Sequence, residues 1–199
     1  MSFRKEAKHS CPESITKKMD SRLRGNDKEE SRNDRERDGN NKKESGNGKQ
    51  GGLMIYLASD HAGFKLKEEI IKLLESLKEE FLDMGTNSEE AVDYPDFIFP
   101  AVEKAVGEDT RAIVFGGTGL GECVAANKVK GAIAVAPYDE FTTVMSREHN
   151  DSNVLCLGGR SLTVENAKSI VELWLGTPFS EEERHIRRLD KIKRYESQL

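Results

Sequence analysis

From residue 54 onwards, short apolar runs alternate with longer segments in which apolar residues recur at helical spacing. The apolar runs, each predicting a strand, are residues 54–58, 81–82, 112–116, 132–136 and 153–157, the second being the weakest. Helices are expected over Leu66–Leu77, from Tyr94 to Val106, from a glycine-rich turn to Asn127, and over 138–148, 164–175 and 180–199. Strands that are apolar throughout and alternate with helices are typical of a parallel sheet covered on both faces. The pattern therefore predicts a three-layer α/β/α domain over 54–199, with a five-stranded, Rossmann-like sheet and a C-terminal helix.

Local signals agree with several of these helix ends. Pro95 suits the first turn of a helix, and Thr163 is expected to cap the helix that follows it. Ser180, followed by three glutamates, is expected to cap the last helix and to give it an acidic first turn.

Residues 1–53 have a different composition from the rest of the chain. They carry 14 Lys and Arg against 10 Asp and Glu, whereas the remainder carries 17 against 26. Few apolar residues are present to offset the entropy of ordering this segment, so it is predicted to be a disordered, passive extension. Its mixed charges and its lack of aromatic stacking platforms argue against nucleic acid as a partner.

The sequence shows no signal-peptide core and no long apolar run, so a soluble, cytoplasmic protein that does not bind membranes is expected. Its cysteines are Cys11, Cys123 and Cys156, an odd number without a CxxC pair or zinc-ligand spacing. Neither a disulfide framework nor a metal site is predicted. Cys123 is either a nucleophile or a small core residue, and the second interpretation is favoured.

The strongest chemical signal is the segment from Ala112 to Glu122, where a strand enters the glycine-rich turn GGTGLGE. Glycines allow positive φ and a close approach of an anion to backbone N–H groups, and a helix that starts there adds its positive dipole end. Glu122 falls in the first turn of that helix, within reach of whatever the turn holds. This arrangement predicts proton transfer on a bound anion.

Polar residues follow three of the predicted strands. Asp60 and His61 follow the first, residues 116–122 follow the third, and Gly158 to Arg160 follow the fifth. Because ligands bind at the carboxyl ends of parallel strands, we expect these groups to share one rim of the sheet. Taken singly, Asp60 and His61 also suit a helix N-cap.

Two further basic groups have a structural and a functional interpretation. Arg147 and His149 suit the C-terminus of a helix, and His149 can also transfer protons near neutral pH. The cations of the segment 184–188 share a helix face and form either a solvated surface or part of an anion site. A dinucleotide site is disfavoured, because the glycine spacing is not GxGxxG and the turn follows the third strand.

Several segments together resemble the ribose-5-phosphate isomerase B family, which also contains the galactose-6-phosphate isomerase subunits. They are, in order, SDHAG at 59–63, DYP at 93–95, GGTGLGE at 116–122 with AANK at 125–128, REHND at 147–151 with NVLCLGGR at 153–160, and RHIRR at 184–188. The resemblance covers essentially all of 54–199 and leaves the N-terminal extension outside.

The resemblance implies roles for individual residues. The backbone of Gly117, Thr118, Gly119 and Gly121 would stabilise the oxygen of an enediolate. Asp60 and His149 would bind and open the furanose ring, with Tyr94 and Asn150 lining the sugar. The phosphate clamp would consist of His61, Arg160, Arg184 and Arg188. Family members are dimers, so the two C-terminal arginines are expected to act in the neighbour's site.

One position decides which residue is the expected base. Many members carry a catalytic cysteine where this chain has Gly116, whereas another branch has glycine there and uses a glutamate at the position of Glu122. This chain matches the second branch, so Glu122 is the expected base and Cys123 is not a displaced form of the family cysteine. A carboxyl group in a closed pocket also has its pKa raised towards a useful range.

The predicted function is therefore the interconversion of D-ribose 5-phosphate and D-ribulose 5-phosphate in the non-oxidative pentose phosphate pathway. The resemblance implies an enediolate intermediate, no metal or cofactor, and a homodimer or tetramer with its active site at the subunit interface. Thr118 is expected to assist proton movement between O1 and O2. Two alternatives stay open: an isomerase of allose or galactose 6-phosphate, and a sugar-phosphate-binding protein without catalysis.

Overall fold

The computed structural model describes residues 54–199, and the predicted disorder of residues 1–53 lies outside them. The described part contains a parallel sheet of five strands in the order β2-β1-β3-β5-β4. The strands are β1 (Ile55–Ser59), β2 (Phe81–Asp83), β3 (Arg111–Gly116), β4 (Ala134–Val135) and β5 (Val154–Gly158). The predicted five-stranded parallel sheet is thus confirmed.

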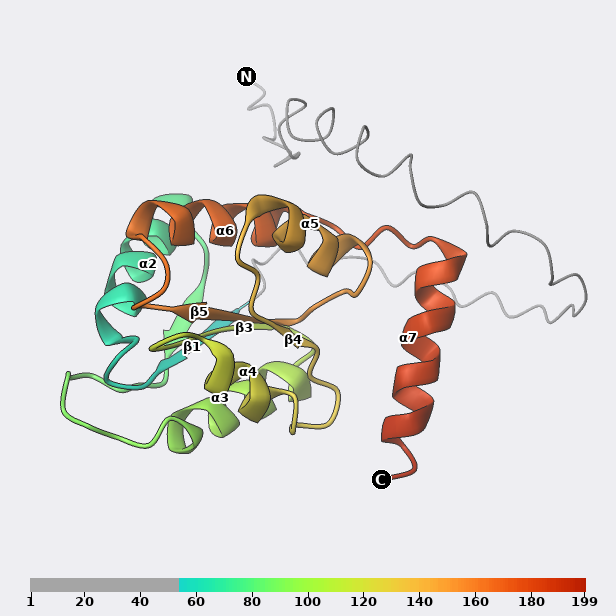
Figure 1. Cartoon of the computed structure of the whole chain (residues 1–199), viewed down its shortest axis with the longest axis horizontal. Coiled ribbons are helices and arrows are strands. Elements are labelled where there is room, and N and C mark those ends of the chain that lie inside the picture. The colour runs from blue at the N-terminus through green and yellow to red at the C-terminus, as the bar shows by residue number, and fades with distance from the viewer. Residues whose placement is uncertain (1–53) are drawn as a thin grey trace, which may run out of the picture. The chain divides into compact units, whose positions relative to one another are not determined.

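Helices cover both faces of this sheet. They are α2 (Phe64–Leu77), α3 (Pro95–Gly107), α4 (Leu120–Ala126), α5 (Glu140–Glu148), α6 (Val164–Gly176) and α7 (Glu183–Glu196). Figure 1 shows α2, α5 and α6 on one face and α3 and α4 on the other, so the three-layer arrangement is confirmed as well. Among residues 54–199, no helix has the length and apolar character needed to cross a membrane.

The core forms two apolar layers, one on each side of the sheet. Along β1, Ile55 and Leu57 face the layer that contains residues of α2 and α6, whereas Tyr56 and Ala58 face the layer built with α3 and α4. Successive side chains of a strand point to opposite faces, so a strand covered on both sides must be apolar at every position. This explains the continuous apolar runs in the sequence.

The edge strand β4 is shorter than predicted, with two residues instead of five. Side-chain amides take over backbone pairing around it. Asn127 accepts a hydrogen bond from the Ala134 N–H and donates one to the Ala134 carbonyl, and Asn153 accepts one from the Ile133 N–H. Asparagine side chains can replace backbone partners in this way, so the edge is satisfied without a longer ladder.

The predicted start of the last helix was wrong. The helix begins at Glu183, its N-cap is Glu182, and no side chain caps it. The hydroxyl of Ser180 instead lies 2.7 Å from Nδ1 of His185. The other two predicted ends are confirmed: Thr163 accepts a hydrogen bond from the Asn166 N–H, and Pro95 opens α3.

Candidate active site

The loops that follow β1, β3 and β5 meet at one rim of the sheet. In the strand register Ser59 lies beside Phe115, and Phe115 lies beside Leu157, so the three strands end together. Backbone hydrogen bonds then join the loops: the Asp60 N–H donates to the Phe115 carbonyl at 3.1 Å, and the Gly159 N–H donates to the Gly116 carbonyl at 2.8 Å. The predicted convergence of these segments is confirmed. We call Asp60, His61, Tyr94, residues 116–122 and Arg160 the rim half-site.

The turn between β3 and α4 has a conformation that requires glycine at its centre. Gly119, the N-cap of α4, has φ 77°, and a Cβ there would lie 3.0 Å from the carbonyl carbon of Leu157. Positive φ is strained for other residues, so both the conformation and the space select glycine. Thr118 beside it is exposed, and its hydroxyl oxygen accepts a weak hydrogen bond of 3.4 Å from the Leu120 N–H.

The carboxyl group of Glu122 is packed against the end of β3. Glu122 is only 3% exposed, and a Cβ built on Gly116 would lie 1.8 Å from its Oε1. Glu122 therefore occupies the space that any side chain at position 116 would need. Burial is the main cause of its raised pKa, the hydrogen bond to its own backbone N–H opposes the shift, and the charge of Asp60 adds to it.

Two other side chains of the rim half-site, those of Asp60 and His61, accept hydrogen bonds from backbone N–H groups. Asp60 Oδ1 accepts hydrogen bonds from the Ala62 and Gly63 N–H groups, both at 2.8 Å, which closes the turn into α2. His61 Nδ1 accepts a hydrogen bond of 3.3 Å from the Val92 N–H, so Nε2 carries the proton and can donate it to a ligand.

Tyr94 and Arg160 lie over the glycine-rich turn. A Cβ on Gly121 would approach the Tyr94 ring to 3.3 Å, and one on Gly117 would approach the Arg160 side chain to 3.7 Å. Glycine at position 121 therefore leaves room for the Tyr94 ring, whereas a Cβ at position 117 would make only ordinary contact with Arg160.

Cys123 faces a different direction from its neighbour Glu122. Its Sγ donates to the Ala134 carbonyl at 3.3 Å, and its side chain packs against the core layer built with α3 and α4. A hydrogen bond with Cys156 is the largest of the effects that lower the pKa of Cys123 to about 7. The interpretation of Cys123 as a core residue is favoured by these contacts. Among residues 54–199, no three His, Cys, Asp or Glu side chains gather where they could hold a metal ion.

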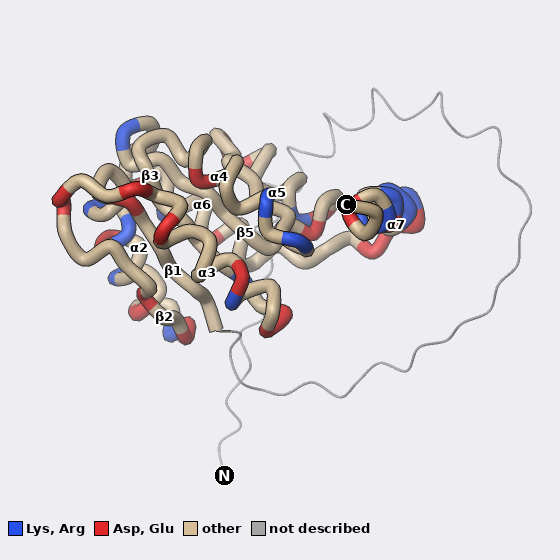
Figure 2. The backbone as a smooth tube through the Cα atoms, turned by 90° about the horizontal axis from the view of Figure 1, so that it is seen from below, with Lys and Arg blue, Asp and Glu red and all other residues tan. Residues whose placement is uncertain are grey.

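A second group of predicted residues lies where α5 ends and α7 begins. We call the predicted residues His149, Asn150, Arg184 and Arg188, together with His185, which was not predicted, the helix half-site. The rings of His149 and His185 are in contact, with centroids 4.1 Å apart and planes inclined by 39°. Figure 2 shows basic residues gathered along α7. The pKa of His149 is lowered mainly by burial and then by the neighbouring His185 ring, by Arg184 and, more weakly, by Arg188, while Glu182 opposes them.

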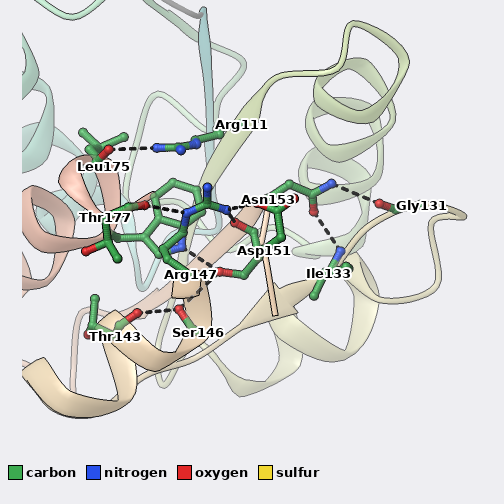
Figure 3. Close-up of polar contacts among 12 residues, drawn as sticks. Arg111, Gly131, Ile133, Thr143, Ser146, Arg147, Asp151, Asn153, Leu175 and Thr177 are labelled. Carbon is green, nitrogen blue, oxygen red and sulfur yellow. Dashed lines mark hydrogen bonds and ion pairs between the residues drawn. The ribbon is translucent and has the colours of Figure 1, made fainter. Parts of the chain in front are cut away.

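The turn that carries His149 and Asn150 is held by a buried arginine (Figure 3). Arg147 donates to the carbonyls of Ser152, at 2.5 Å, and Thr177, at 3.2 Å, and forms an ion pair of 2.9 Å with Asp151. Its guanidinium group also lies 5.8 Å from the centre of the Trp174 ring. Sequence reasoning treated Arg147 only as a charge suited to a helix end, because two of these partners, Thr177 and Trp174, come from a distant part of the chain.

The two half-sites lie at opposite ends of the sheet. The rim half-site follows the carboxyl ends of the strands, whereas His149 and Asn150 lead into the amino end of β5. Five residues of extended chain span about 16 Å, so the side chains cannot meet within one chain. Figure 1 shows α7 on the side where the strands begin. The structure therefore does not bring Asp60 and His149, the expected ring-opening pair, together in a single copy.

A parallel sheet with a glycine-rich anion cradle and a buried carboxylate at its carboxyl rim defines a class of α/β proteins that bind small anionic ligands and can transfer protons on them. Within that class the assignment is specific. The chain belongs to the ribose/galactose isomerase family, whose model matches residues 55–192.

Individual relatives agree with this assignment. A ribose-5-phosphate isomerase B of Mycolicibacterium paratuberculosis is 42% identical over 146 residues, which are 72% of this chain and 92% of that protein. The structure of the Clostridium thermocellum ribose-5-phosphate isomerase B matches with a TM-score of 0.71 and 41% identity, over 73% of this chain and 99% of that one. The Mycoplasma genitalium enzyme with bound ribulose-5-phosphate matches with a TM-score of 0.70 and 40% identity, over 73% and 97%.

Proposed function

We propose that this chain interconverts D-ribose 5-phosphate and D-ribulose 5-phosphate through an enediolate, as an aldose–ketose isomerase of the non-oxidative pentose phosphate pathway. The observation that carries the proposal is the carboxyl group of Glu122, buried against Gly116 beside a turn of backbone N–H groups. The names of the relatives, and the ribulose-5-phosphate bound to one of them, support this choice of substrate.

Glu122 is the proposed base. Once the sugar is in its open form, its carboxylate removes the proton from C2 and later returns it to C1. Its raised pKa makes the protonated carboxyl group a stable intermediate form, as the return step requires. No second acid is needed to protonate C1, because the same carboxyl group takes the proton from C2 and returns it to C1.

The glycine-rich turn is the proposed oxyanion site. Its N–H groups stabilise the negative charge that develops on the sugar oxygens. The hydroxyl of Thr118 assists the transfer of a proton between O1 and O2. Asp60 uses Oδ1 for its own turn, and we assign Oδ2 to the sugar hydroxyls. Nε2 of His61 and the guanidinium group of Arg160 bind the phosphate.

A second copy of the chain completes the site. His149 is proposed to open the furanose ring, with Asn150 lining the sugar and with Arg184 and Arg188 on the phosphate, yet all four lie at the amino end of the strands. We infer that a homodimer places the helix half-site of one copy against the rim half-site of the other. The sequence led us to expect only the two arginines to act in the neighbour's site. We now propose that His149 and Asn150 act there as well.

Exposed apolar side chains on both parts of the surface support this pairing. Leu120, within the rim half-site, and Val124, one turn further along α4, are each 62% exposed, and Ile186 and Ile192 are exposed on α7. A two-fold pairing that sets α7 of one copy over α4 of the other buries both groups twice, once in each site. Exposed apolar groups of this kind mark contact surfaces when they are contiguous.

The reaction is tested by measuring ribulose 5-phosphate formed from ribose 5-phosphate by chelator-treated protein. We expect Glu122→Gln to lower kcat by about 10²–10⁴-fold, because it removes the base. Cys123→Ala is the matched control at the next residue and is expected to retain activity. Loss of activity in Cys123→Ala, with activity kept in Glu122→Gln, would show that the base is the thiol.

The shared site is tested by mixing two inactive variants, Glu122→Gln and His149→Ala. If each site takes its rim half-site from one copy and its helix half-site from the other, a mixed dimer contains one intact site and one doubly altered site. Random exchange of subunits then restores about a quarter of the wild-type activity. Each variant incubated alone is the control, and a mixture as inactive as its components would place both residues in one copy's site.

The family description also includes galactose, which keeps a six-carbon substrate as the second candidate. Pentose and hexose phosphates share the aldehyde end and the phosphate, and they differ in the number and configuration of the hydroxyl-bearing carbons between them. Comparing kcat/KM on ribose 5-phosphate with that on allose 6-phosphate and galactose 6-phosphate decides between them.

A further inference from the structure

The ring of His185 is buried, and the proposed reaction does not use it. His185 is 1% exposed, and its ring lies against that of His149 with a centroid distance of 4.1 Å. The resemblance assigns its neighbours Arg184 and Arg188 to the phosphate clamp but gives His185 no role. A buried titratable ring in contact with a proposed acid–base group therefore needs an explanation of its own.

Burial separates His185 from the two arginines. Residues 184 and 188 are one helical turn apart and share a face of α7, and residue 185 is turned by about 100° from residue 184 and about 60° from residue 188. Arg188 is exposed and Arg184 half-buried, while His185 is packed against its own chain. One turn of α7 thus presents cations outwards and holds an imidazole ring inwards against His149.

Ser180 connects the two helices that carry the histidines. Its hydroxyl lies 2.7 Å from Nδ1 of His185, and its backbone N–H donates to the carbonyl of Glu148, the last residue of α5, at 3.1 Å. One residue therefore fixes the rotation of the His185 ring and ties it to the end of the helix from which His149 projects.

Several groups on α7 and at its N-cap act on the pKa of His149. Besides His185, they are Arg184, Arg188 and Glu182, and with burial their combined effect is to lower the pKa of His149. A neutral imidazole carries one N–H donor and one acceptor nitrogen, so its action on a sugar depends on which way the ring is turned.

We propose that His185 is a positioning residue: its ring, held by Ser180, keeps the imidazole of His149 in the orientation needed to open the furanose ring in the partner's site. The inference rests on the proposed function, because it takes ring opening as the task of His149. In that step the bond between C1 and the ring oxygen breaks, the C1 hydroxyl loses its proton to become the aldehyde, and the ring oxygen gains a proton.

Ring opening can be measured apart from isomerisation. Glu122→Gln removes the base for C2, so ribose 5-phosphate labelled with ¹³C at C1 only exchanges between its two furanose anomers, which NMR exchange spectroscopy follows. We expect this variant protein to accelerate the exchange. Adding His185→Ala should reduce the acceleration by about tenfold or more, since a small misplacement of a catalytic group has a large effect. Adding His185→Phe, which keeps a ring, should recover part of it.

Leu189→Ala is the matched control, because it truncates a buried side chain one turn further along α7 and leaves the rings of His149 and His185 in place. We expect it to leave the exchange within about twofold of the Glu122→Gln background. The proposal is overturned if His185→Ala leaves the exchange unchanged, if Leu189→Ala reduces it equally, or if Glu122→Gln gives no acceleration although the wild type isomerises. Should His185→Ala not fold, Ser180→Ala replaces it, with a smaller loss expected and no loss counting against the proposal.

A failure of the proposed function would be recognised separately. Wild-type protein that does not form ribulose 5-phosphate contradicts the assigned reaction, whereas the anomer exchange still reports whether His185 affects ring opening.

Discussion

The rim half-site and the helix half-site are built in different ways. In the rim half-site, backbone N–H groups and the side chains beside them lie at the ends of aligned strands, and hydrogen bonds between neighbouring loops fix them there. In the helix half-site the groups are side chains at the end of α5 and on α7, held by a ring contact, a serine and a buried arginine. The first is as rigid as the sheet, and the second depends on how α7 is docked.

Because of this difference, substitutions in the two half-sites are expected to change different kinetic constants. Changes in the rim half-site displace the groups that meet the reacting carbons, so they should act on kcat. Changes in the helix half-site remove charge from the phosphate or loosen His149, so those at the arginines should act on KM. In the proposed dimer, each copy supplies the rim half-site of one active site and the helix half-site of the other.

After removal of the base itself, the largest effect is expected from a single methyl group in the rim half-site. In Gly116→Ala the new Cβ competes with the carboxyl group of Glu122, which now lies within 1.8 Å of that position. We expect kcat to fall on the order of 10²–10³-fold, because the base is pushed from its place. Steady-state kinetics with ribose 5-phosphate measures this.

Gly107→Ala is the matched control, because a Cβ at the end of α3 meets nothing within 4 Å. It should leave kcat unchanged. A Gly116→Ala protein as active as this control would show that the carboxyl group of Glu122 need not lie against β3 for catalysis.

A smaller effect, and one on a different constant, is expected in the helix half-site. Arg188→Ala should raise KM for ribose 5-phosphate by about 10- to 100-fold, the value of one or two charge-assisted hydrogen bonds, with kcat changed only a few-fold. Arg187→Ala, an exposed neighbour on the same helix, is the control and should change neither constant. If Arg188→Ala lowered kcat and left KM unchanged, the division between the half-sites would be wrong.

Most of the fold could be predicted from the sequence, because both faces of the sheet are buried and its strands are therefore apolar runs. The runs at 112–116 and 153–157 correspond to β3 and β5 within one residue, since every position of these strands must be apolar. The edge was harder to predict. The length of β4 depends on Asn127 and Asn153, whose side chains replace backbone partners from distant positions, and local propensity carries no sign of that.

The separation of the half-sites was contained in the sequence. His149 precedes the strand at 153–157, whereas Asp60 follows the strand at 54–58, so parallel topology alone puts them at opposite ends. The role of Ser180 and the inward face of His185 could not be obtained in this way. Periodicity defines the faces of a helix, but only the docked structure shows which face meets which neighbour.

The pH dependence offers a test within the rim half-site. The charge of Asp60 contributes to the raised pKa of Glu122, after burial. Asp60→Asn keeps an oxygen that can accept the Ala62 and Gly63 N–H bonds but removes the charge. The pKa of Glu122 should fall, so the acidic limb of the kcat/KM profile should move to lower pH, whatever the loss in absolute rate. Asp93→Asn changes an exposed carboxylate in the loop before α3. It is the control and should leave the acidic limb of the profile in place.

The smallest effect concerns stability. Because the pKa of Glu122 is raised in the folded protein, folding disfavours its ionised form, and stability is lost as the pH rises through that pKa. Glu122→Gln stays neutral at every pH. Its Tm should therefore exceed that of the wild type by a few degrees at pH 8 and not at pH 4. Glu103→Gln makes the same change at an exposed position of α3 and should give no such difference. A Glu122→Gln protein that melts below the wild type at pH 8 would mean that the carboxylate stabilises the rim half-site, so that catalysis and stability favour the same residue there.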